Sequence, residues 1–149
     1  EDETSVYEAF IDMVMFAQKL LQREISVLRD VREGVSYVHS AYQNAEDKRL
    51  IVIDEDYPWH EVLSQYPEPF FVVYPNSARD MWRLKTVRDN TSSYKLRKAL
   101  PETWAGKTGA ELQQITGVPD AVFCHNKRFT SAARSKEGAL ALARIALEN

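Results

Sequence analysis

The stretch FFVVYPNSARDMWRLKTV, residues 70–87, predicts a β-hairpin, and the other elements can be placed outward from it. Two runs rich in aromatic and β-branched side chains, Phe70–Tyr74 and Met81–Val87, are typical of strands. The residues that join them, Pro75–Asp80, include Pro, Asn and Ser, which favour turns. We therefore expect two antiparallel neighbours at this point of a sheet.

The second strand of this hairpin should have two different faces, because side chains alternate along a strand. One face holds Trp82, Leu84 and Thr86, and the other holds Met81, Arg83 and Lys85. We expect the first face to be part of the core and the second to be basic.

Downstream of the hairpin, the sequence predicts helix, strand, turn and helix. Thr108 and Glu111 fit a capping box that opens a helix, which Gly117 and Pro119 are suited to close. A strand is expected at Ala121–His125, followed by a tight basic turn at residues 126–128. Ser135 is then placed to cap a final helix. Its buried side should consist of Ala139, Leu140, Leu142, Ala143 and Leu147.

Upstream of the hairpin, the main feature is a long amphipathic helix. Ser5 and Glu8 fit a capping box, and apolar residues then recur at intervals of three and four from Val6 to Val38. Gly34 is the position at which this helix could break. An apolar stripe of this length needs cover from a sheet or a partner. A short strand at Leu50–Ile53 and a short helix at residues 59–66 follow.

Together these elements predict an α+β fold. Residues 1–48 should form a helical arm, and residues 49–149 should form a small, mainly antiparallel sheet packed with helices. The composition, 44% hydrophobic and 28% charged over 149 residues, is that of a soluble globular protein. No apolar run approaches the roughly 20 residues that a membrane-spanning helix needs.

The compartment expected from the sequence is the cytoplasm. Cys124 is the single cysteine, so no internal disulfide calls for an oxidising environment. The acidic start of the chain also lacks the basic residues that begin a signal peptide.

Charge is distributed unevenly along the chain. Residues 1–75 carry 15 acidic and 6 basic side chains, a net charge of −9, whereas residues 76–149 carry 7 acidic and 13 basic ones, a net charge of +6. A basic half suits a polyanionic partner such as nucleic acid. The alternatives are that the two halves neutralise each other or that the charges are simply solvated.

Neither a metal site nor a catalytic site is expected within this chain. His39, His60 and His125 are far apart in the sequence, without the spacing that places two imidazoles on one helical face. The acidic run Asp54–Asp56 is most simply a solvated turn. Cys124 and His125 are neighbours on a predicted strand, so their side chains should leave opposite faces and form no catalytic pair.

The most site-like segment is HNKRFTSAARSK, residues 125–136. A helix that starts at Ser135 would present free amides, which together with the helix dipole attract anions. Arg134, Ser135 and Lys136 are the predicted phosphate contacts at this helix start. His125, Lys127 and Arg128 would add contacts and long-range attraction from the preceding turn. The alternative is an ordinary cap beside a solvated turn.

Two tryptophans are candidates for stacking on bases. Trp82 lies on a strand beside Leu84, which favours a place in the core. Trp104 lies in a loop between Pro101 and Gly106 and is the better candidate for a stacking contact.

Several stretches of the C-terminal half are specific enough to indicate a family. They are Leu100-Pro101-Glu102 with Trp104 and Gly106, Thr116-Gly117-Val118-Pro119, Val122-Phe123 and Lys136-Glu137-Gly138-Ala139-Leu140. In this order, between Phe70 and the end, they resemble the C-terminal region of the MYG family. Its members are predicted metal-dependent hydrolases related to DHH phosphoesterases.

The resemblance implies a substrate-binding or accessory domain similar to the C-terminal domain of DHH-related phosphoesterases. The intact enzyme would cleave phosphodiester bonds of nucleic acid as an exonuclease, using Mn²⁺ or a similar ion held in an N-terminal catalytic domain absent from this chain. This chain alone would then hold no cofactor and be inactive. Many relatives have Gly-Gly-His where this chain has Ser131, Ala132 and Ala133.

The expected partners are that catalytic domain, RNA or another nucleic acid or phosphorylated substrate, and a second copy of the chain bound through the N-terminal helices. The competing interpretation is a non-catalytic interaction or dimerisation module, in which the helical stripe is the functional surface.

Overall fold

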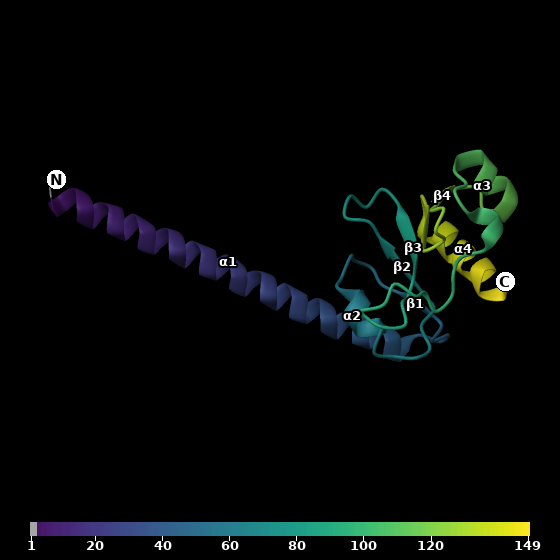
Figure 1. The fold of residues 1–149 in the computed structure, drawn as a ribbon, viewed down its shortest axis with the longest axis horizontal. Helices are drawn as coiled ribbons and strands as arrows, with labels where there is room; N and C mark the ends of the chain where they lie inside the picture. The colour runs from purple at the N-terminus through teal and green to yellow at the C-terminus, as the bar shows by residue number, and fades with distance from the viewer. Residues whose placement is uncertain (1–2) are drawn as a thin grey trace. The chain divides into compact units, whose positions relative to one another are not determined.

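The structure is a computed structural model that describes residues 3–149 (Figure 1). The chain divides into two compact units, residues up to Gly34 and Val35–Asn149. Helix α1, Glu3–Asn44, runs through both units without a break, so the break expected near Gly34 does not occur. The helix already includes Ser5 and Glu8, and the capping box predicted there is therefore wrong.

Within the described residues, Val35–Asn149 contains a five-stranded sheet with the order β1-β2-β3-β5-β4. Strand β1 pairs with β2 in parallel, and every other neighbouring pair is antiparallel. The strands are β1 Leu50–Val52, β2 Phe71–Pro75, β3 Trp82–Thr86, β4 Ala121–Cys124 and β5 Thr130–Ala133. This arrangement confirms the predicted α+β class with a mainly antiparallel sheet. The compact unit begins at Val35, however, which is earlier than the boundary expected at residue 49.

The predicted hairpin is present as β2 and β3. Phe71 pairs with Thr86, and Tyr74 pairs with Arg83. The connecting turn is held by Asn76, whose amide nitrogen donates to Asp80 Oδ1 at 2.6 Å and whose side-chain oxygen accepts from the Asp80 amide at 3.2 Å. The turn residues singled out in the sequence thus bond to one another, as Asn and Asp commonly do.

One face of the sheet packs against α3, Gly109–Thr116, and α4, Lys136–Glu148. Phe71, Val73 and Leu84 lie on this face and are fully buried beneath the helices. The short helix η1, Glu102–Trp104, adds Trp104 to the same core. Gly117 closes α3 in the left-handed conformation, with φ of 70°, as predicted. Thr108 makes no side-chain cap, and Glu111 pairs with Lys107 instead, so the second capping box is also wrong.

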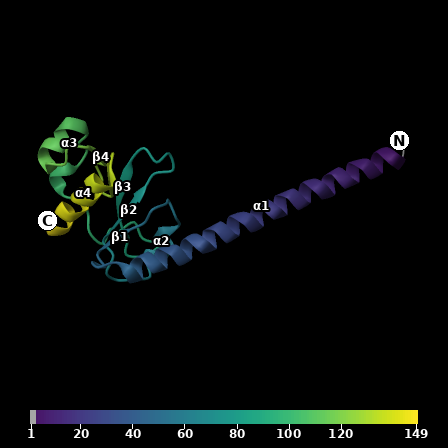
Figure 2. The ribbon, with the colours of Figure 1, turned by 180° about the vertical axis from the view of Figure 1, so that it is seen from behind.

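The other face is covered by helices over β1 and β2. There the last turns of α1 and the short helix α2, Trp59–Leu63, pack on Ile51, Val72 and Tyr74. Helices α2 and α4 lie on opposite sides of the sheet in both views (Figures 1 and 2). Beyond this cover, β3 presents Arg83 and Lys85, which confirms that its second face is basic.

The first unit consists of the N-terminal part of α1 and exposes large apolar side chains. The exposed residues, all between 44% and 71% accessible, are Val6, Tyr7, Phe10, Met13, Val14, Met15, Phe16, Leu20, Leu21, Ile25, Val27, Leu28 and Val31. A seven-residue spacing links Tyr7, Val14, Leu21, Leu28, Val35 and Tyr42. The stripe therefore continues into the second unit, where Val35, Val38 and Tyr42 pack beside the sheet.

The two edges of the sheet are short. Strand β1 has only three residues, and β4 has a register shift between Ala121 and Phe123. Thr108 forms an isolated bridge with Phe123, on the outer side of β4.

Candidate functional site

The basic turn predicted after β4 is present. His125 follows the strand, its carbonyl accepts from the Arg128 amide at 2.8 Å, and its Nδ1 accepts from the Lys127 amide at 3.1 Å. Arg128 has φ of 59°, the left-handed conformation that lets the chain reverse here. Lys127 is exposed and Arg128 is half-buried.

The phosphate site predicted at the start of α4 is already filled by Asp120. Its Oδ2 accepts from the Ser135 amide at 2.7 Å and from the Ser135 hydroxyl at 2.5 Å. The Ser135 hydroxyl in turn accepts from the Gly138 amide at 3.0 Å. A carboxylate at a helix N-terminus satisfies the same amides and dipole that would attract a phosphate. Ser135 is the helix cap as predicted, its amide and hydroxyl are occupied by Asp120, and phosphate contact at this helix start stays a prediction.

The two basic neighbours of Ser135 are not gathered into a pocket. Lys136 lies over the ring of Trp82, with 5.3 Å from Nζ to the ring centroid, and this contact accounts for its position. Arg134 is exposed on the surface. Its backbone amide donates to the Asp120 carbonyl at 3.0 Å.

The structure does not favour the stacking role considered for Trp104, which stays a prediction. Its side chain is 2% exposed and lies in the core beneath α3 and α4. A ring that is enclosed in this way offers no face to a base. Trp82 is partly buried against the same core, as expected.

Cys124 and His125 do not form a catalytic pair. The Cys124 thiol donates to the His125 carbonyl at 3.7 Å, and burial raises the pKa of Cys124 to about 11. The His125 ring instead contacts Phe129, with 4.5 Å between ring centroids. A buried thiol of this pKa is almost entirely protonated at neutral pH and is a poor nucleophile.

Among the described residues, no three His, Cys, Asp or Glu side chains lie together in a way that could hold a metal ion. His39 Nδ1 forms a hydrogen bond with the Tyr66 hydroxyl at 2.7 Å, so this nitrogen already has a partner within the chain. The helices of residues 3–149 include none that is long and apolar enough to cross a membrane.

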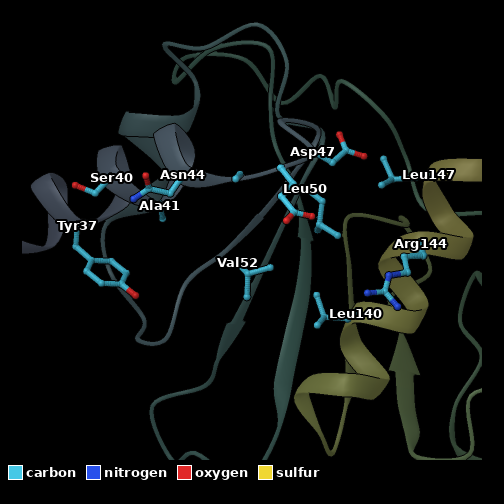
Figure 3. Close-up of a pocket in the computed structure, with 12 residues that line it drawn as sticks. Tyr37, Ser40, Ala41, Asn44, Asp47, Leu50, Val52, Leu140, Arg144 and Leu147 are labelled. Carbon is cyan, nitrogen blue, oxygen red and sulfur yellow. The ribbon is translucent and has the colours of Figure 1, made fainter.

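A cavity of about 650 Å³ lies beside the β1 edge of the sheet (Figure 3). Tyr37 and Ala41 of α1, Leu50 and Val52 of β1, and Leu140 of α4 supply its apolar walls. Its charged lining residues are Glu46, Asp47 and Arg144. Asp47 is engaged by Arg49 at 2.7 Å. Because the acids outnumber the base, this cavity is poorly suited to an anionic ligand.

A second cavity of about 350 Å³ lies on the other face of the sheet, and we call it the basic cavity. It is bounded by Asp56, Tyr57, Pro58, Trp59, His60, Tyr74, Arg83, Lys85, Thr86, Arg88, Leu96 and Phe129. Strand β3 contributes Arg83 and Lys85, α2 contributes His60, and the segment after β3 contributes Arg88. Arg83 and Lys85 converge because side chains alternate along β3: Leu84, which lies between them, belongs to the opposite face.

The basic cavity holds positive charges close enough to lower the pKa values of Lys85 and His60. The pKa of Lys85 is lowered by burial and then by the nearby positive charges of Arg83 and Arg88, with Asp56 acting in the opposite direction. The pKa of His60 is lowered by burial first and by Arg88 second. Both shifts show that positive charge is disfavoured in this cavity when no anion compensates it.

Unpaired polar atoms gather at the same place. Among the described residues, the buried side-chain nitrogens and oxygens without a hydrogen-bond partner are His60 Nε2, Arg83 Nε and Thr130 Oγ1. His60 and Arg83 line the basic cavity, and Thr130 is the cross-strand partner of Lys85. An unpaired buried donor costs about 1–3 kcal/mol, so three in one region is an uncommon concentration.

Sequence reasoning found the basic face of β3 but not this cavity. Arg83, Lys85 and Arg88 form an Arg-x-Lys-x-x-Arg run, which could have drawn attention as a concentration of cations on one strand. His60 could not have been linked to that run, because it comes from a helix more than twenty residues earlier in the chain.

Comparison with known proteins identifies the family. The family model MYG1_exonuc, described as Uncharacterised protein family (UPF0160), matches residues 1–147. The chain belongs to this family. It is 38% identical over 97 residues to the human MYG1 exonuclease, which is 60% of this chain and 26% of the human protein.

Two further relatives extend the match along the chain. The MYG1 protein of Dictyostelium discoideum is 30% identical over 124 residues, 79% of this chain and 36% of the relative. The MYG1 protein of Caenorhabditis elegans is 27% identical over 163 residues, 99% of this chain and 48% of the relative. The chain thus spans between about a quarter and a half of the length of these relatives.

Proposed function

We propose that this chain is the substrate-binding portion of a MYG1-family exonuclease that acts on nucleic acid. The observation that carries the proposal is the basic cavity of Arg83, Lys85, Arg88 and His60, in a chain whose human relative is named an exonuclease. Convergent cations on one face of a sheet suit the phosphate backbone of a nucleic acid.

The chemistry is proposed to lie in the remaining length of the protein. A nuclease related to DHH phosphoesterases would use Mn²⁺ or a similar ion to activate water. The described side chains of this chain do not assemble a donor set of carboxylates and imidazoles that fits such an ion. We therefore propose that the metal is held outside this chain.

Residues 6–31 of α1, the exposed part of the helical arm, support the proposal that the catalytic portion lies outside this chain. Between Val6 and Ala17 apolar side chains, including Phe10, Met13 and Phe16, cover most of the circumference of the helix, and Glu8 and Asp12 occupy the remaining side. An exposed apolar surface this wide is typical of a helix that packs against a larger folded body. One partner helix would cover only part of it. We propose that the arm docks on the catalytic portion.

A second candidate function is a dimerisation module built on the same arm. The seven-residue spacing of Tyr7, Val14, Leu21 and Leu28 is the observation that favours it, since such a repeat can pair two helices. Glu24 interrupts the stripe three residues after Leu21, which weakens the pairing of two identical helices.

The decisive test compares the full-length protein with the 149-residue chain. We expect the full-length protein to hydrolyse single-stranded oligonucleotides in Mn²⁺, and the chain alone to bind them without hydrolysis. Binding measured by fluorescence anisotropy should weaken steeply between about 50 and 200 mM salt, as phosphate contacts do. RNA and DNA probes of the same sequence would show whether the chain prefers ribose or deoxyribose.

Two outcomes would reject the proposal. The first is hydrolysis by the purified chain alone that follows the protein through purification and is abolished by EDTA. The second is a chain that binds no oligonucleotide at low salt but forms a stable dimer by light scattering, which would favour the dimerisation module.

A further inference from the structure

We propose that the basic cavity between α2 and β3 is a binding site for a phosphate group carried on a nucleotide. This inference rests on the proposed function and deepens it, because it names the group that the cavity recognises. The cavity combines convergent cations, unpaired donors and apolar walls.

The cations of the cavity are held in place by the register of the sheet. Arg83 pairs with Tyr74 on one side and Ala132 on the other, and Lys85 pairs with Val72 and Thr130. Two residues on one face of a strand are fixed relative to each other by the backbone. Arg83 and Lys85 can therefore act on one ligand group, and Arg88 approaches from the segment beyond the strand.

The counter-charge available within the cavity is small. Asp56 is the acidic residue of the lining, against Arg83, Lys85 and Arg88. The start of α4 gives a useful contrast, because there Asp120 supplies the anion from within the chain. In the basic cavity the positive charge is left for an external anion to balance.

The unpaired donors match the acceptor oxygens of a phosphate. Among the described residues, Arg83 Nε and His60 Nε2 are buried without a hydrogen-bond partner, although their side chains line the cavity. Thr130 adds an unpaired hydroxyl beside Lys85. A phosphate has several oxygens, all acceptors, and can satisfy more than one of these donors at once.

The walls of the cavity favour a nucleotide over a free phosphate ion. Trp59, Tyr74, Phe129 and Leu96 supply aromatic and apolar surface beside the cations. Trp59 and Tyr74 are buried, with ring centroids 5.9 Å apart. Leu96 and Phe129 are half-buried, so a base or sugar can pack on them while its phosphate meets the cations.

The test is a calorimetric titration of the 149-residue chain in phosphate-free buffer with three probes: adenosine 5′-monophosphate, adenosine and inorganic phosphate. We expect saturable binding of the nucleotide, weaker binding of inorganic phosphate, and none of adenosine. Sodium chloride at matched ionic strength should not displace the nucleotide. Adenosine binding as tightly as the nucleotide would overturn the inference.

The key variant is Arg83→Gln, which removes one charged donor. It should weaken nucleotide binding by about tenfold or more, as expected for a charged hydrogen bond. The matched control is Arg23→Gln, the same change at an exposed position of the helical arm, and it should leave the affinity unchanged. Undiminished nucleotide binding by Arg83→Gln would overturn the inference.

Thermal melts of the same variants test whether Arg83 has only a structural role. Arg83→Gln should melt at the same temperature as the parent chain or higher, because it relieves repulsion and an unpaired donor. A melt that is lowered together with the affinity would overturn the assignment of Arg83 to the ligand. Oligonucleotide binding by the full-length protein without nucleotide binding in the cavity would reject this inference but leave the proposed function intact.

Discussion

Lys85 lies on β3 beside Arg83, where burial and neighbouring positive charges act against the charge of Lys85. The pKa of Lys85 is lowered by burial and by Arg83 and Arg88, which means that its charged form is less stable in the folded chain than in the unfolded one. Residues of this kind commonly mark functional sites, because binding can require groups that the fold alone would not favour.

Lys85→Met is therefore expected to stabilise the chain. The folded pKa lies below the ordinary value of 10.5, so the folded chain holds this proton less tightly at neutral pH. Removing the charge should raise the free energy of unfolding by about 0.5–2 kcal/mol, the range of single stabilising changes. Urea denaturation at pH 7 measures it, with exposed Lys95→Met as the control. A loss of stability in Lys85→Met would contradict this account.

The lowered pKa of His60 predicts how the stability of the chain depends on pH. Its pKa is lowered in the folded chain, by burial and by Arg88, from the ordinary value of 6.5. As pH falls below 6.5 the unfolded chain takes up this proton first, so stability is lost on acidification. The His60→Gln variant should lose less stability between pH 7.5 and 5 than the parent chain does. Parallel pH profiles from urea denaturation in phosphate-free buffer would argue against it.

The raised pKa of Cys124 predicts that its thiol reacts slowly in the folded chain. Its pKa of about 11, against an ordinary 9.0, leaves about a hundredfold less thiolate in the folded chain at pH 8. A disulfide reagent should therefore react with folded Cys124 at least about a hundredfold more slowly than with the urea-unfolded chain. The folded state also binds this proton more tightly, so stability should fall as pH rises above about 9. Equal rates in both states would show that the thiol is accessible.

At the scale of elements, the start of α4 depends on a contact from outside the helix. Asp120, in the turn before β4, accepts a hydrogen bond from the Ser135 amide. Gly138 has no room for a side chain, because a Cβ there would collide with the Asp120 carboxylate. The helix is thereby joined to the turn after α3.

Two substitutions test this junction. Asp120→Ala should destabilise the chain by about 1–3 kcal/mol, since it leaves buried donors unpaired. Gly138→Ala should also destabilise it by about 1–3 kcal/mol through overpacking, although Ala normally favours a helix over Gly. Thermal melts measure both, and exposed Asp89→Ala is the control. A more stable Gly138→Ala would show that Asp120 can move aside.

The elements differ in how far their sequence could predict them. The hairpin of β2 and β3 was predictable because its alternation and its turn residues are local. The capping boxes were not, because Glu111 pairs with Lys107 and the start of α1 precedes Ser5. The place of β5 between β3 and β4, and the parallel pairing of β1, depend on contacts between distant segments that no local pattern encodes.

The distinction between local patterns and contacts of distant segments also explains how far the candidate site could be predicted. The segment around Ser135 has the local features of an anion site, and only the fold shows that Asp120 reaches it. The basic cavity has a local part, the alternation of Arg83 and Lys85, and a distant part in α2. The family resemblance, by contrast, was carried by short local stretches, and the match over residues 1–147 confirms it.

At the scale of the whole molecule, the core of the second unit draws only on the last turns of α1. Val38 is fully buried there, with Val35, Ala41 and Tyr42 packed around it. Residues 35–149 are therefore expected to fold on their own and to melt within a few degrees of the 149-residue chain. Circular dichroism would measure this, and a truncated chain without a cooperative melt would contradict it.

Amide exchange gives the complementary measurement on the arm. In the 149-residue chain, amides of residues 6–31 should exchange quickly, because exposed helices open locally at little cost. In the full-length protein the same amides should be protected by the docked catalytic portion. Fast exchange in both proteins would argue against docking, and slow exchange in the chain at high concentration alone would indicate self-association.

The edges of the sheet determine how this chain would misassemble. A long, flat edge strand can recruit a strand from another molecule and begin a fibre. Here β1 is only three residues long, and β4 is interrupted by its register shift and bridged by Thr108. Both outer strands are thus poor templates for a foreign strand. Aggregates of the isolated chain should therefore retain helical arms packed together and lack a cross-β signature.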